Sequence, residues 1–479
     1  MKLNERKHQK TKIVATLGPA CSEQDILEGM ILAGVDVFRL NFSHGDHEGH
    51  QATINKIMQI NERHNINVGI LADLQGPKLR VGEIENNGIQ LDKDDIITFV
   101  NTKCVGTKEA IYMSYENFAQ DVTKGEKVLI DDGKLVLEVA ETNNKDKVEL
   151  KVVFGGILSS RKGVNLPDTK ISLPSLTEKD LKDLAFILTQ PVNWIALSFV
   201  RSGAEILALK EKITAAGHFA KVIAKVEKPE AVADIKNIIK ATDAVMIARG
   251  DLGVEVAMEL LPAIQKDVIS RCIKAGRPVI VATQMMESMI TNPSPTRAEI
   301  TDVANAVLDG ADAVMLSGET SIGKHPIGVV TAMSKIIEQA EKHYELHSKR
   351  PKAKKESATY YSDVICFGAA KLAEDINAKA ILGITVSGHT AFKVSSYRPN
   401  SDIFIFSSVR QMLGTMNLVW GVRTFFYDKF SSTDETITDL SEILKEEKLL
   451  EKGDVVVNTA SMPLHKRFRT NTLKITIVD

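Results

Sequence analysis

Short runs of β-branched and aliphatic residues recur along residues 12–320, and most of them end in polar or charged residues. Near-continuous apolar runs of this length predict strands that are buried on both faces. Stretches with helical spacing, such as residues 178–189 and 203–217, lie between most of these runs. Eight strand–helix alternations predict a closed (β/α)₈ TIM barrel, a fold in which the carboxyl ends of the strands carry the chemistry. The eight runs are residues 12–18, 35–43, 68–75, 194–201, 221–227, 244–251, 278–284 and 312–320.

One gap interrupts this alternation. About 118 residues separate the third run from the fourth, which is too many for a loop in a compact domain. The gap contains alternating strand-like runs and turn signals such as Asp132-Gly133 and Asn143-Asn144. We therefore predict a small inserted β-barrel domain over residues 76–170, placed as a lid above the active-site end of the barrel. Its strand-like runs are residues 96–100, 127–131, 135–140 and 147–155.

The last part of the chain alternates again after a charged stretch. Residues 341–357 are rich in Lys and Glu and are typical of a solvated connector. Helices near residues 358–376 and after residue 390 then alternate with apolar runs, which predicts an open α/β domain. The predicted division is a barrel domain (1–75 and 171–345), the inserted domain (76–170) and a C-terminal α/β domain (346–479). The apolar runs of the last domain are residues 380–386, 402–408, 422–427, 454–460 and 473–479.

Composition narrows the class of protein. The 479 residues include 60 Lys and Arg against 62 Asp and Glu, a net charge of −2 that argues against nucleic acid as the main partner. No run approaches 18 apolar residues, so no membrane span is expected. The polar, basic N-terminus does not resemble a secretory signal. The 4 cysteines form no CxxC pair, and a reduced, cytoplasmic setting is the simplest interpretation.

The strongest candidate for chemistry lies at the ends of the fifth and sixth runs. Lys225 and Glu227 are two residues apart on one strand end and therefore point to the same side. Asp251 ends the next strand and places a second carboxylate nearby. Two carboxylates suit Mg²⁺, which usually keeps waters and takes further oxygens from its substrate. Lys225 would add positive charge where an oxyanion develops.

A buried ion pair that closes one end of the barrel is the plainer interpretation of this cluster. Three further strand ends weigh against this interpretation, because they bring Arg39, Asp73 and Thr283 to the same place. We call this place, the carboxyl end of the barrel, the mouth. Polar side chains that converge from five strands are difficult to explain as packing.

Two other patterns have plainer explanations. Residues 318–324 fit the spacing of a Walker-type phosphate loop, but His325 stands where Ser or Thr would bind Mg²⁺. His44, His47 and His50 recur every three residues and raise the question of zinc. Their spacing is not an HExxH pattern, and a solvated loop that leads into a helix is the favoured interpretation.

A weaker signal lies in the C-terminal domain. One turn follows a strand and opens a helix, a geometry that offers backbone N–H groups to a phosphate. The turn consists of Ser387, Gly388, His389 and Thr390, and a basic loop further on contains Lys466, Arg467 and Arg469. Together they predict either a site for an anionic effector or an ordinary strand–helix turn beside an exposed loop.

At this point the residues match a known family. The segments TKIVATLGPA, FRLNFSHG, ADLQGPKLR, RKGVNLP, IAKVEKPE, ARGDLGVE, ATQMMESM and MLSGET occur in this order. In content and order they resemble the pyruvate kinase family over essentially the whole chain. The resemblance implies transfer of a phosphoryl group from phosphoenolpyruvate to ADP, which gives pyruvate and ATP in the last step of glycolysis. Such a transfer needs positioning and charge neutralisation more than covalent help from the protein.

The resemblance also implies roles for individual residues. Glu227 and Asp251 resemble the ligands of Mg²⁺ (or Mn²⁺). Lys225 resembles the lysine that stabilises the phosphoryl group in flight and the enolate left behind. Arg39 resembles the arginine on the substrate phosphate, and Thr283 a catalytic residue near the enolate face that is protonated. The substrate-binding positions are Arg39, Lys225, Gly250, Asp251 and Thr283, and the contacts to nucleotide phosphates are Arg80 and Lys162.

One departure from the family pattern concerns K⁺. Members that need K⁺ carry a glutamate where this chain has Lys78. We expect the ammonium of Lys78 to replace the potassium ion electrostatically, since a second cation close to a fixed Lys⁺ would be repelled. K⁺ would then be dispensable, although four residues still match the potassium-coordinating positions of the family: Asn41, Ser43, Asp73 and Leu74.

The family also implies regulation and assembly. Its members use the C-terminal domain for effectors and form homotetramers, and the turn at 387–390 lines up with their phosphate-cradling loop. Because Val386 and His389 depart from the common loop pattern, a sugar phosphate and a nucleotide both remain candidates. We expect the bacterial form without the extra C-terminal domain.

Two rival functions remain open. A Mg²⁺-dependent lyase or aldolase on the same barrel would give no role to the inserted domain. A catalytically silent, effector-binding relative would have lost Lys225, Glu227, Asp251 or Thr283, all of which are present.

Overall fold

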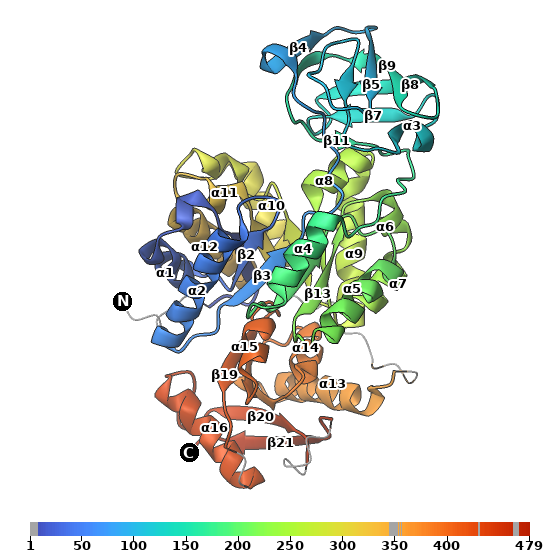
Figure 1. The fold of residues 1–479 in the computed structure, drawn as a ribbon. Helices are drawn as coiled ribbons and strands as arrows, with labels where there is room; N and C mark the ends of the chain where they lie inside the picture. Colours follow the sequence, from blue (N-terminus) through green and yellow to red (C-terminus); the bar gives the residue numbers. More distant parts are fainter. Residues whose placement is uncertain (1–7, 344–352, 354, 356, 430–431, 463–468) are drawn as a thin grey trace.

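A closed ring of eight parallel strands forms the centre of the molecule (Figure 1). The computed structural model describes residues 8–343, 353, 355, 357–429, 432–462 and 469–479. The order around the ring is β1-β16-β15-β14-β13-β12-β3-β2, so every predicted barrel strand is confirmed. The strands are β1 (Lys12–Thr16), β2 (Val37–Asn41), β3 (Gly69–Asp73), β12 (Trp194–Leu197), β13 (Lys221–Val226), β14 (Ala244–Ala248), β15 (Val279–Ala282) and β16 (Ala313–Leu316).

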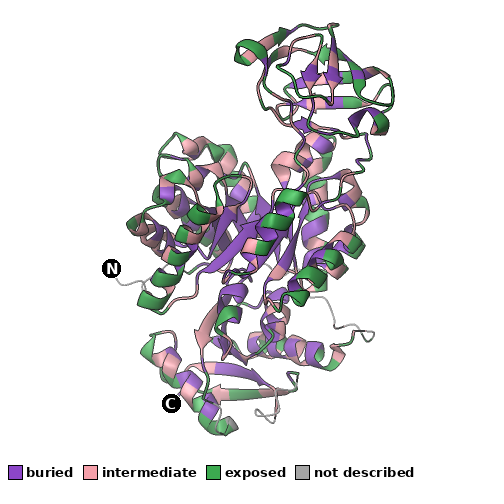
Figure 2. Ribbon diagram, viewed as in Figure 1, coloured by how far each residue is buried: buried purple, intermediate pink, exposed green. Residues whose placement is uncertain are grey.

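Burial explains the strand sequences. Nearly every residue of the ring is buried, as Figure 2 shows, because alternate side chains face the barrel interior and the surrounding helices. Val14, Leu71 and Met246 belong to the interior group, whereas Ile13, Ile70 and Val245 pack with the helices. Apolar side chains are therefore needed on both faces, which accounts for the near-continuous apolar runs.

Helices surround the ring and return the chain to the start of the next strand. The two helices expected over 178–189 and 203–217 are confirmed as α4 (Glu178–Ile187) and α5 (Gly203–Ala215). The others are α1 (Gln24–Ala33), α2 (His47–His64), α6 (Pro229–Ala233), α7 (Ile235–Ala241), α8 (Arg249–Glu255), α9 (Leu261–Ala275), α10 (Arg297–Leu308), α11 (Gly318–Ser321) and α12 (Pro326–His343).

The part of the chain between β3 and α4 forms a separate β unit beyond the carboxyl ends of the barrel strands (Figure 1). Its strands form a six-stranded sheet, β11-β7-β8-β9-β5-β6, and a two-stranded sheet, β10-β4. Single-residue bridges Arg80–Gly163 and Val81–Met113 connect the two edges of the larger sheet through residues 80–81. The elements are β4 (Gly88–Leu91), β5 (Ile96–Val100), β6 (Ile111–Tyr112), α3 (Phe118–Asp121), β7 (Lys127–Ile130), β8 (Leu135–Thr142), β9 (Lys147–Phe154), β10 (Gly156–Ser159) and β11 (Val164–Asn165).

The C-terminal unit is the expected open α/β sheet, in the order β19-β18-β17-β20-β21. Only β21, at the edge, runs antiparallel to its neighbour among these five strands. Helices α13, α14 and α15 pack on one face, and α16 packs on the other. The elements are α13 (Tyr360–Asp375), β17 (Ala380–Ile384), α14 (His389–Ser396), β18 (Asp402–Ser407), α15 (Arg410–Met416), β19 (Val422–Phe426), α16 (Thr433–Glu446), β20 (Val455–Ala460) and β21 (Thr472–Ile477).

The prediction of a solvated connector over residues 341–357 is wrong at its amino-terminal end. Glu341 was expected in a solvated stretch, but it belongs to the last turns of α12. Its carboxylate accepts hydrogen bonds from the backbone N–H groups of Lys10 (3.1 Å) and Thr11 (2.6 Å). These two contacts with a distant part of the chain stabilise the end of α12. From the charged composition alone, this turn is predicted to be solvated. Most of the connector, including residues 344–352, lies outside the described residues.

A buried ion pair joins the C-terminal unit to the amino-terminal end of the barrel. The guanidinium of Arg398 makes two contacts with Asp312, at 3.2 and 3.0 Å, and also donates to the carbonyl of Gly310 at 2.8 Å. Both side chains are at most 5% exposed. Asp312 also accepts from the backbone N–H groups of Val279 and Trp420. The carboxylate therefore connects two barrel strands to the second unit.

No helix in the described part of the chain is long and apolar enough to cross a membrane.

We predict that Arg398→Met lowers the free energy of unfolding by about 3–5 kcal/mol, because it leaves Asp312 buried without its cation. Urea denaturation followed by circular dichroism measures the loss. Lys371→Met is the matched control, because Lys371 forms an exposed pair with Asp375 that contributes below about 1 kcal/mol. An Arg398→Met variant as stable as this control would contradict the prediction.

Candidate active site

The ammonium of Lys225 is the centre of the barrel mouth. It lies 2.8 Å from Glu227 Oε1 and 3.4 Å from Asp73 Oδ1, and it donates to Ser198 Oγ at 2.7 Å. The residue is 8% exposed. Burial by itself lowers the pKa of Lys225, but the charges of Asp73 and Glu227 raise it above its ordinary value. The side chain therefore presents a fixed positive charge to the mouth.

Asp73 connects this lysine to Arg39. Nε and an Nη atom of Arg39 each lie 2.7 Å from Asp73 Oδ2, and the guanidinium also donates to Thr16 Oγ1 at 2.9 Å. Burial raises the pKa of Asp73, but Lys225 and Arg39 outweigh this effect and hold the pKa below its ordinary value. The carboxylate thus stays ionised between two cations. Sequence analysis expected Arg39, Asp73 and Lys225 at one mouth, and the structure brings them together there.

Glu227 is as deeply buried as Asp73, and both acids are 1% exposed. Oε2 of Glu227 accepts from the backbone N–H of Phe199 at 2.6 Å. Oε1 lies beside Lys225 but accepts no hydrogen bond of good geometry from the described residues. Burial raises the pKa of Glu227, and the nearby charge of Asp251 raises it further against the opposing effect of Lys225.

Asp251 and Gly250 lie in the first turn of α8, directly after β14. The N–H of Gly250 donates to Thr283 Oγ1 at 2.7 Å, so the mouth ends of β14 and β15 are connected through this hydroxyl. Thr283 has φ of +69°, a left-handed conformation that a β-branched residue rarely adopts. Strain of this kind is typical of functional sites, where the surrounding contacts hold it in place.

These residues fit a magnesium ion. Asp251 contributes to the electrostatic surroundings of both Lys225 and Glu227, so the two carboxylates share one mouth. Oε1 of Glu227 is buried beside the ammonium of Lys225 at 2.8 Å and accepts no further hydrogen bond from the described residues. Among the described residues there is no group of three or more His, Cys, Asp and Glu with metal-site geometry. Mg²⁺ commonly takes one or two protein carboxylates and completes its coordination with water and substrate oxygens, and Glu227 and Asp251 would supply such a pair.

Arg80 and Lys162 lie side by side where the chain enters the inserted domain and where it approaches β11. The backbone N–H of Val81 donates to the carbonyl of Lys162 at 3.0 Å, so the two basic residues are neighbours although 82 positions separate them. Arg80 donates to the carbonyl of Arg161, and Lys162 forms an ion pair with Asp131 at 2.9 Å. Burial lowers the pKa of His44, on the loop after β2, and the charge of Arg80 lowers it further, so Arg80 lies on the side of the domain that faces this loop of the barrel.

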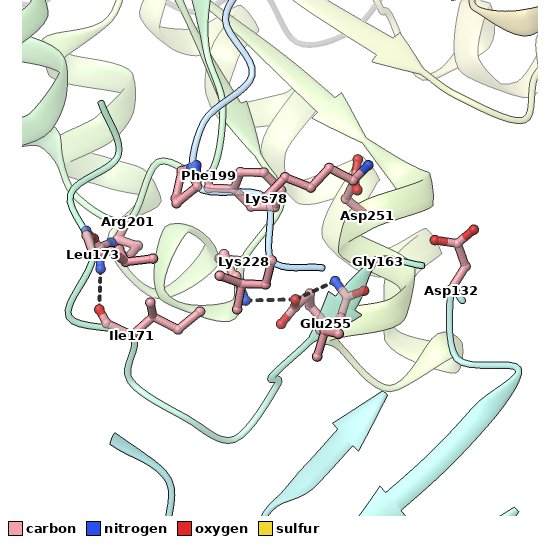
Figure 3. A pocket seen from close by; sticks show the side chains of 14 residues that line it. Lys78, Asp132, Gly163, Ile171, Leu173, Phe199, Arg201, Lys228, Asp251 and Glu255 are labelled. Atoms are coloured by element: carbon pink, nitrogen blue, oxygen red, sulfur yellow. Dashed lines mark hydrogen bonds and ion pairs between the residues drawn. The ribbon is translucent and has the colours of Figure 1, made fainter. Parts of the chain in front are cut away.

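The residues of the predicted K⁺-type site lie at the ends of the paired strands β2 and β3 and in the loops that follow them. Ser43 donates its N–H to Asn41 Oδ1 at 3.1 Å, and the carbonyl of Leu74 accepts from Ser198 Oγ at 2.7 Å. No ion pair joins Lys78 to Asp73 in the part of the chain that the structure describes. Lys78 instead lines the pocket below the inserted domain and extends toward Asp251 in Figure 3.

The two rejected patterns have structural explanations. Residues 318–321 form the short helix α11, and the buried carboxylate of Glu319 accepts hydrogen bonds from the backbone N–H groups of Ser317 and Met286. Among the three histidines, His47 contacts Asp183 at 2.8 Å, and His50 contacts the carbonyl of His44 at 3.0 Å. The interpretation of the second pattern as a loop that leads into a helix is confirmed by α2.

The turn at 387–390 opens α14, as expected, with Gly388 at φ of +82°. The ring of His389 contacts the buried carboxylate of Asp363 at 3.1 Å, and Lys393 contacts its other oxygen at 3.2 Å. Burial lowers the pKa of His389, although Asp363 opposes this effect. Lys466 and Arg467 lie outside the described residues, whereas Arg469 donates to the carbonyl of Ala358.

Sequence analysis missed several residues around the mouth. Ser198 holds Lys225, and Arg201 donates to the carbonyls of Ile171 and Leu173 in the returning linker of the inserted domain (Figure 3). A second group, Asn165, Lys228 and Glu255, forms a buried cluster nearby. No spacing signal marks these contacts. The position of Ser198 and Arg201 at the end of the fourth strand run was the available hint.

Comparison with known families finds two matches. The family described as "Pyruvate kinase, barrel domain" matches residues 8–330. The family described as "Pyruvate kinase, alpha/beta domain" matches residues 363–476. The two matches together span most of the chain, so the resemblance stated from the sequence is confirmed.

Individual relatives are similar over nearly the full length. "Pyruvate kinase 2" of Synechocystis sp. is 43% identical over 473 residues, which cover 98% of this chain and 79% of the relative. The pyruvate kinase of Corynebacterium glutamicum is 42% identical and covers 98% of this chain and 97% of the relative. Among solved structures, a pyruvate kinase from Cryptosporidium parvum has a TM-score of 0.92 and 36% identity, with 98% and 96% coverage.

We predict that Thr283→Val weakens phosphoenolpyruvate binding about tenfold, because the Gly250 N–H loses its acceptor and the mouth ends of β14 and β15 lose their connection. Isothermal titration calorimetry measures the affinity. Thr301→Val is the control, since Thr301 is exposed and its hydroxyl donates to the carbonyl of Arg297 one turn earlier in α10. Equal affinities for the two variants would contradict the assignment.

Proposed function

The chain belongs to the pyruvate kinase family of phosphotransferases, and we propose from this premise which of its residues carry each part of the reaction. The family transfers a phosphoryl group from phosphoenolpyruvate to ADP in glycolysis. The observation that carries the proposal is the position of Lys225, fixed between Asp73 and Glu227 at the carboxyl end of the barrel. An assay of pyruvate formed from phosphoenolpyruvate, with and without ADP, tests the function directly. ADP-independent release would instead indicate a lyase.

Arg39 and Lys225 supply the positive charge for the transferred group. Arg39 binds the phosphate of phosphoenolpyruvate, and its contacts with Asp73 and Thr16 hold the guanidinium in one orientation. Lys225 neutralises the charge of the phosphoryl group in transit and of the enolate oxygen left behind. Because Asp73 and Ser198 hold the lysine in place before the substrate arrives, little reorganisation is needed during the transfer.

Glu227 and Asp251 would hold Mg²⁺ (or Mn²⁺), and the family generally uses Mg²⁺. The ion, when bound, neutralises phosphate and carboxylate oxygens of the substrate. Within the protein, Phe199 N–H orients Glu227, and the connection between Gly250 and Thr283 orients the turn that carries Asp251. Thr283 then lies beside the enolate, on the face where pyruvate takes up its proton.

The inserted domain, residues 76–170, acts as a lid that brings the nucleotide. Arg80 and Lys162 bind the phosphates of ADP from above the mouth. Their adjacent positions on the paired strand segments support this role, because two cations on one rigid edge suit a diphosphate. The hinge contains Gly76 at φ of +68°, where a Cβ would lie 2.9 Å from Ser198 and Phe199. A side chain at this position would push the first linker off the barrel.

K⁺ is dispensable in this chain, although the family generally uses it. The carboxylate of Asp73, a member of the K⁺-type site, already lies between Arg39 and Lys225. Burial lowers the pKa of His44 on the adjacent loop, and the charges of Arg80, Lys78 and Arg39 lower it further. The lowered pKa of His44 supports a strongly positive electrostatic environment at this loop, to which Lys78 contributes. Such an environment leaves little need for another cation.

The C-terminal domain, residues 346–479, takes a phosphorylated effector and assembles the chain as a homotetramer. The N–H groups at the start of α14 support an effector site, and His389 and Lys393 add basic groups there. A sugar phosphate and a nucleotide remain the candidate effectors, and the cytoplasm is the proposed location.

We predict that Lys225→Met lowers kcat by about 10³-fold while the fold stays intact, because one charge aimed at the transition state is lost. Steady-state kinetics measure kcat, and circular dichroism checks the fold. The matched control is Lys221→Met, at the opposite end of the same strand, where the ammonium lies over Phe392. Near-normal turnover of Lys225→Met would mean that the role is assigned wrongly.

We predict that KCl changes turnover by less than about twofold in a tetraalkylammonium buffer, because Lys78 already supplies the charge. Lys78→Glu should make turnover depend on KCl, since it places the glutamate of K⁺-dependent members at this position. Initial rates over a KCl titration measure both effects. Strong activation of the unaltered chain by KCl would refute the prediction.

A further inference from the structure

A buried cluster lies where the inserted domain returns to the barrel, and the residue roles proposed so far do not use it. Glu255, the last residue of α8, is 3% exposed. Its Oε1 accepts from Lys228 Nζ at 2.7 Å and from Asn165 Nδ2 at 2.7 Å (Figure 3). Its Oε2 has no hydrogen-bond partner in the described part of the chain. Oε1 of Glu255 therefore accepts both hydrogen bonds of the cluster.

The three residues come from three different parts of the active site. Lys228 directly follows Glu227 at the end of β13. Glu255 ends the seven-residue helix that carries Gly250 and Asp251. The cluster is thus connected through short stretches of backbone to both proposed magnesium ligands.

Asn165 belongs to the inserted domain. It lies on β11, which pairs with β7, and it is three residues from Lys162. The turn after β7 also approaches α8, because a Cβ built on Gly133 would lie 3.8 Å from Val254 Cγ1. The bond between Asn165 and Glu255 is therefore a side-chain hydrogen bond between the sheet of the inserted domain and the helix of Asp251.

The two bonds to Glu255 have different strengths. Lys228 and Glu255 form a buried charge pair within the barrel, which is costly to break once formed. Asn165 contributes a neutral amide, whose bond to a carboxylate is weaker and carries no charge of its own. The barrel half of the cluster is consequently rigid, and the contact with the inserted domain can be removed without leaving an unpaired buried charge.

We propose that Asn165 is a positioning residue for the nucleotide: its bond to Glu255 holds the inserted domain over the mouth with Arg80 and Lys162 directed at the phosphates of ADP. The proposal rests on the nucleotide role of Lys162 given above. The binding groups for phosphoenolpyruvate lie on the barrel itself, so the contact affects the two substrates differently.

The test compares Asn165→Ala and Asn165→Asp in the full-length enzyme. The aspartate has nearly the shape of asparagine but places a second carboxylate against Glu255, so it should disturb the contact more than alanine. We expect the KM for ADP to rise about fivefold in the alanine variant and further in the aspartate variant. The KM for phosphoenolpyruvate should stay within about twofold in both. Gln120→Ala is the control, because its amide bonds to the Lys145 carbonyl inside the same domain.

A spin-label distance measurement adds a readout that does not depend on activity. Cys104 is an exposed cysteine in the inserted domain, whereas Cys21, Cys272 and Cys366 are buried. A second label at the exposed barrel position Glu211→Cys reports the distance between the two units. We expect Asn165→Ala to broaden the distribution of distances and Asn165→Asp to broaden it more.

The outcomes separate this proposal from the proposed function. An Asn165→Asp variant with unaltered KM values and distances would overturn the proposal, since Asn165 would then only fill space. An equal rise in the KM for ADP and in the KM for phosphoenolpyruvate would also overturn the proposal. The substitution would then act through Asp251 and not through the position of the inserted domain. If Lys162→Met raises the KM for ADP while neither Asn165 variant does, the proposed function stands and the positioning role falls. If none of the three changes that KM, the nucleotide assignment and this proposal both fail.

Discussion

The charge of Lys225 is the constraint on which the site depends. The ammonium of a lysine residue that is 8% exposed is stable only with partners, and they come from β3, the end of β12 and the end of its own strand. Only the closed ring brings these strand ends to one place. Asp73 in turn holds Arg39, and Glu227 is held by the backbone of Phe199. The barrel therefore builds a preorganised charge arrangement, which is what phosphoryl transfer requires.

The units outside the barrel add contacts that the transfer alone does not need. The C-terminal unit is bound to the amino-terminal end of the barrel through Arg398 and Asp312, at the end opposite the mouth. The inserted domain and its returning linker are bound at the mouth through single hydrogen bonds, such as those of Asn165 and Arg201. A buried ion pair on one side and separate hydrogen bonds on the other suit a lid that moves against a fixed base.

Much of the fold follows from hydrophobic pattern alone. Each barrel strand is buried on both faces and therefore requires apolar side chains at nearly every position. The resulting run of apolar residues is visible in the sequence. The short strands β6 and β11 contain two residues each and leave no such run, so they could not be predicted. Glu341 was misplaced because its partners, the N–H groups of Lys10 and Thr11, lie more than 300 positions away. The polar strand ends revealed Lys225, Glu227 and Asp251, but Ser198, Asn165 and the left-handed backbone of Thr283 depend on contacts that no local spacing encodes.

The account depends most on Glu227 and Asp251 binding the same ion. Crystals soaked with MnCl₂ and measured at the manganese absorption edge locate the metal by its anomalous signal. The account predicts one strong peak at the barrel mouth, within about 2.3 Å of a carboxylate oxygen from each residue. A peak bound by only one of them, or none at the mouth, would contradict it.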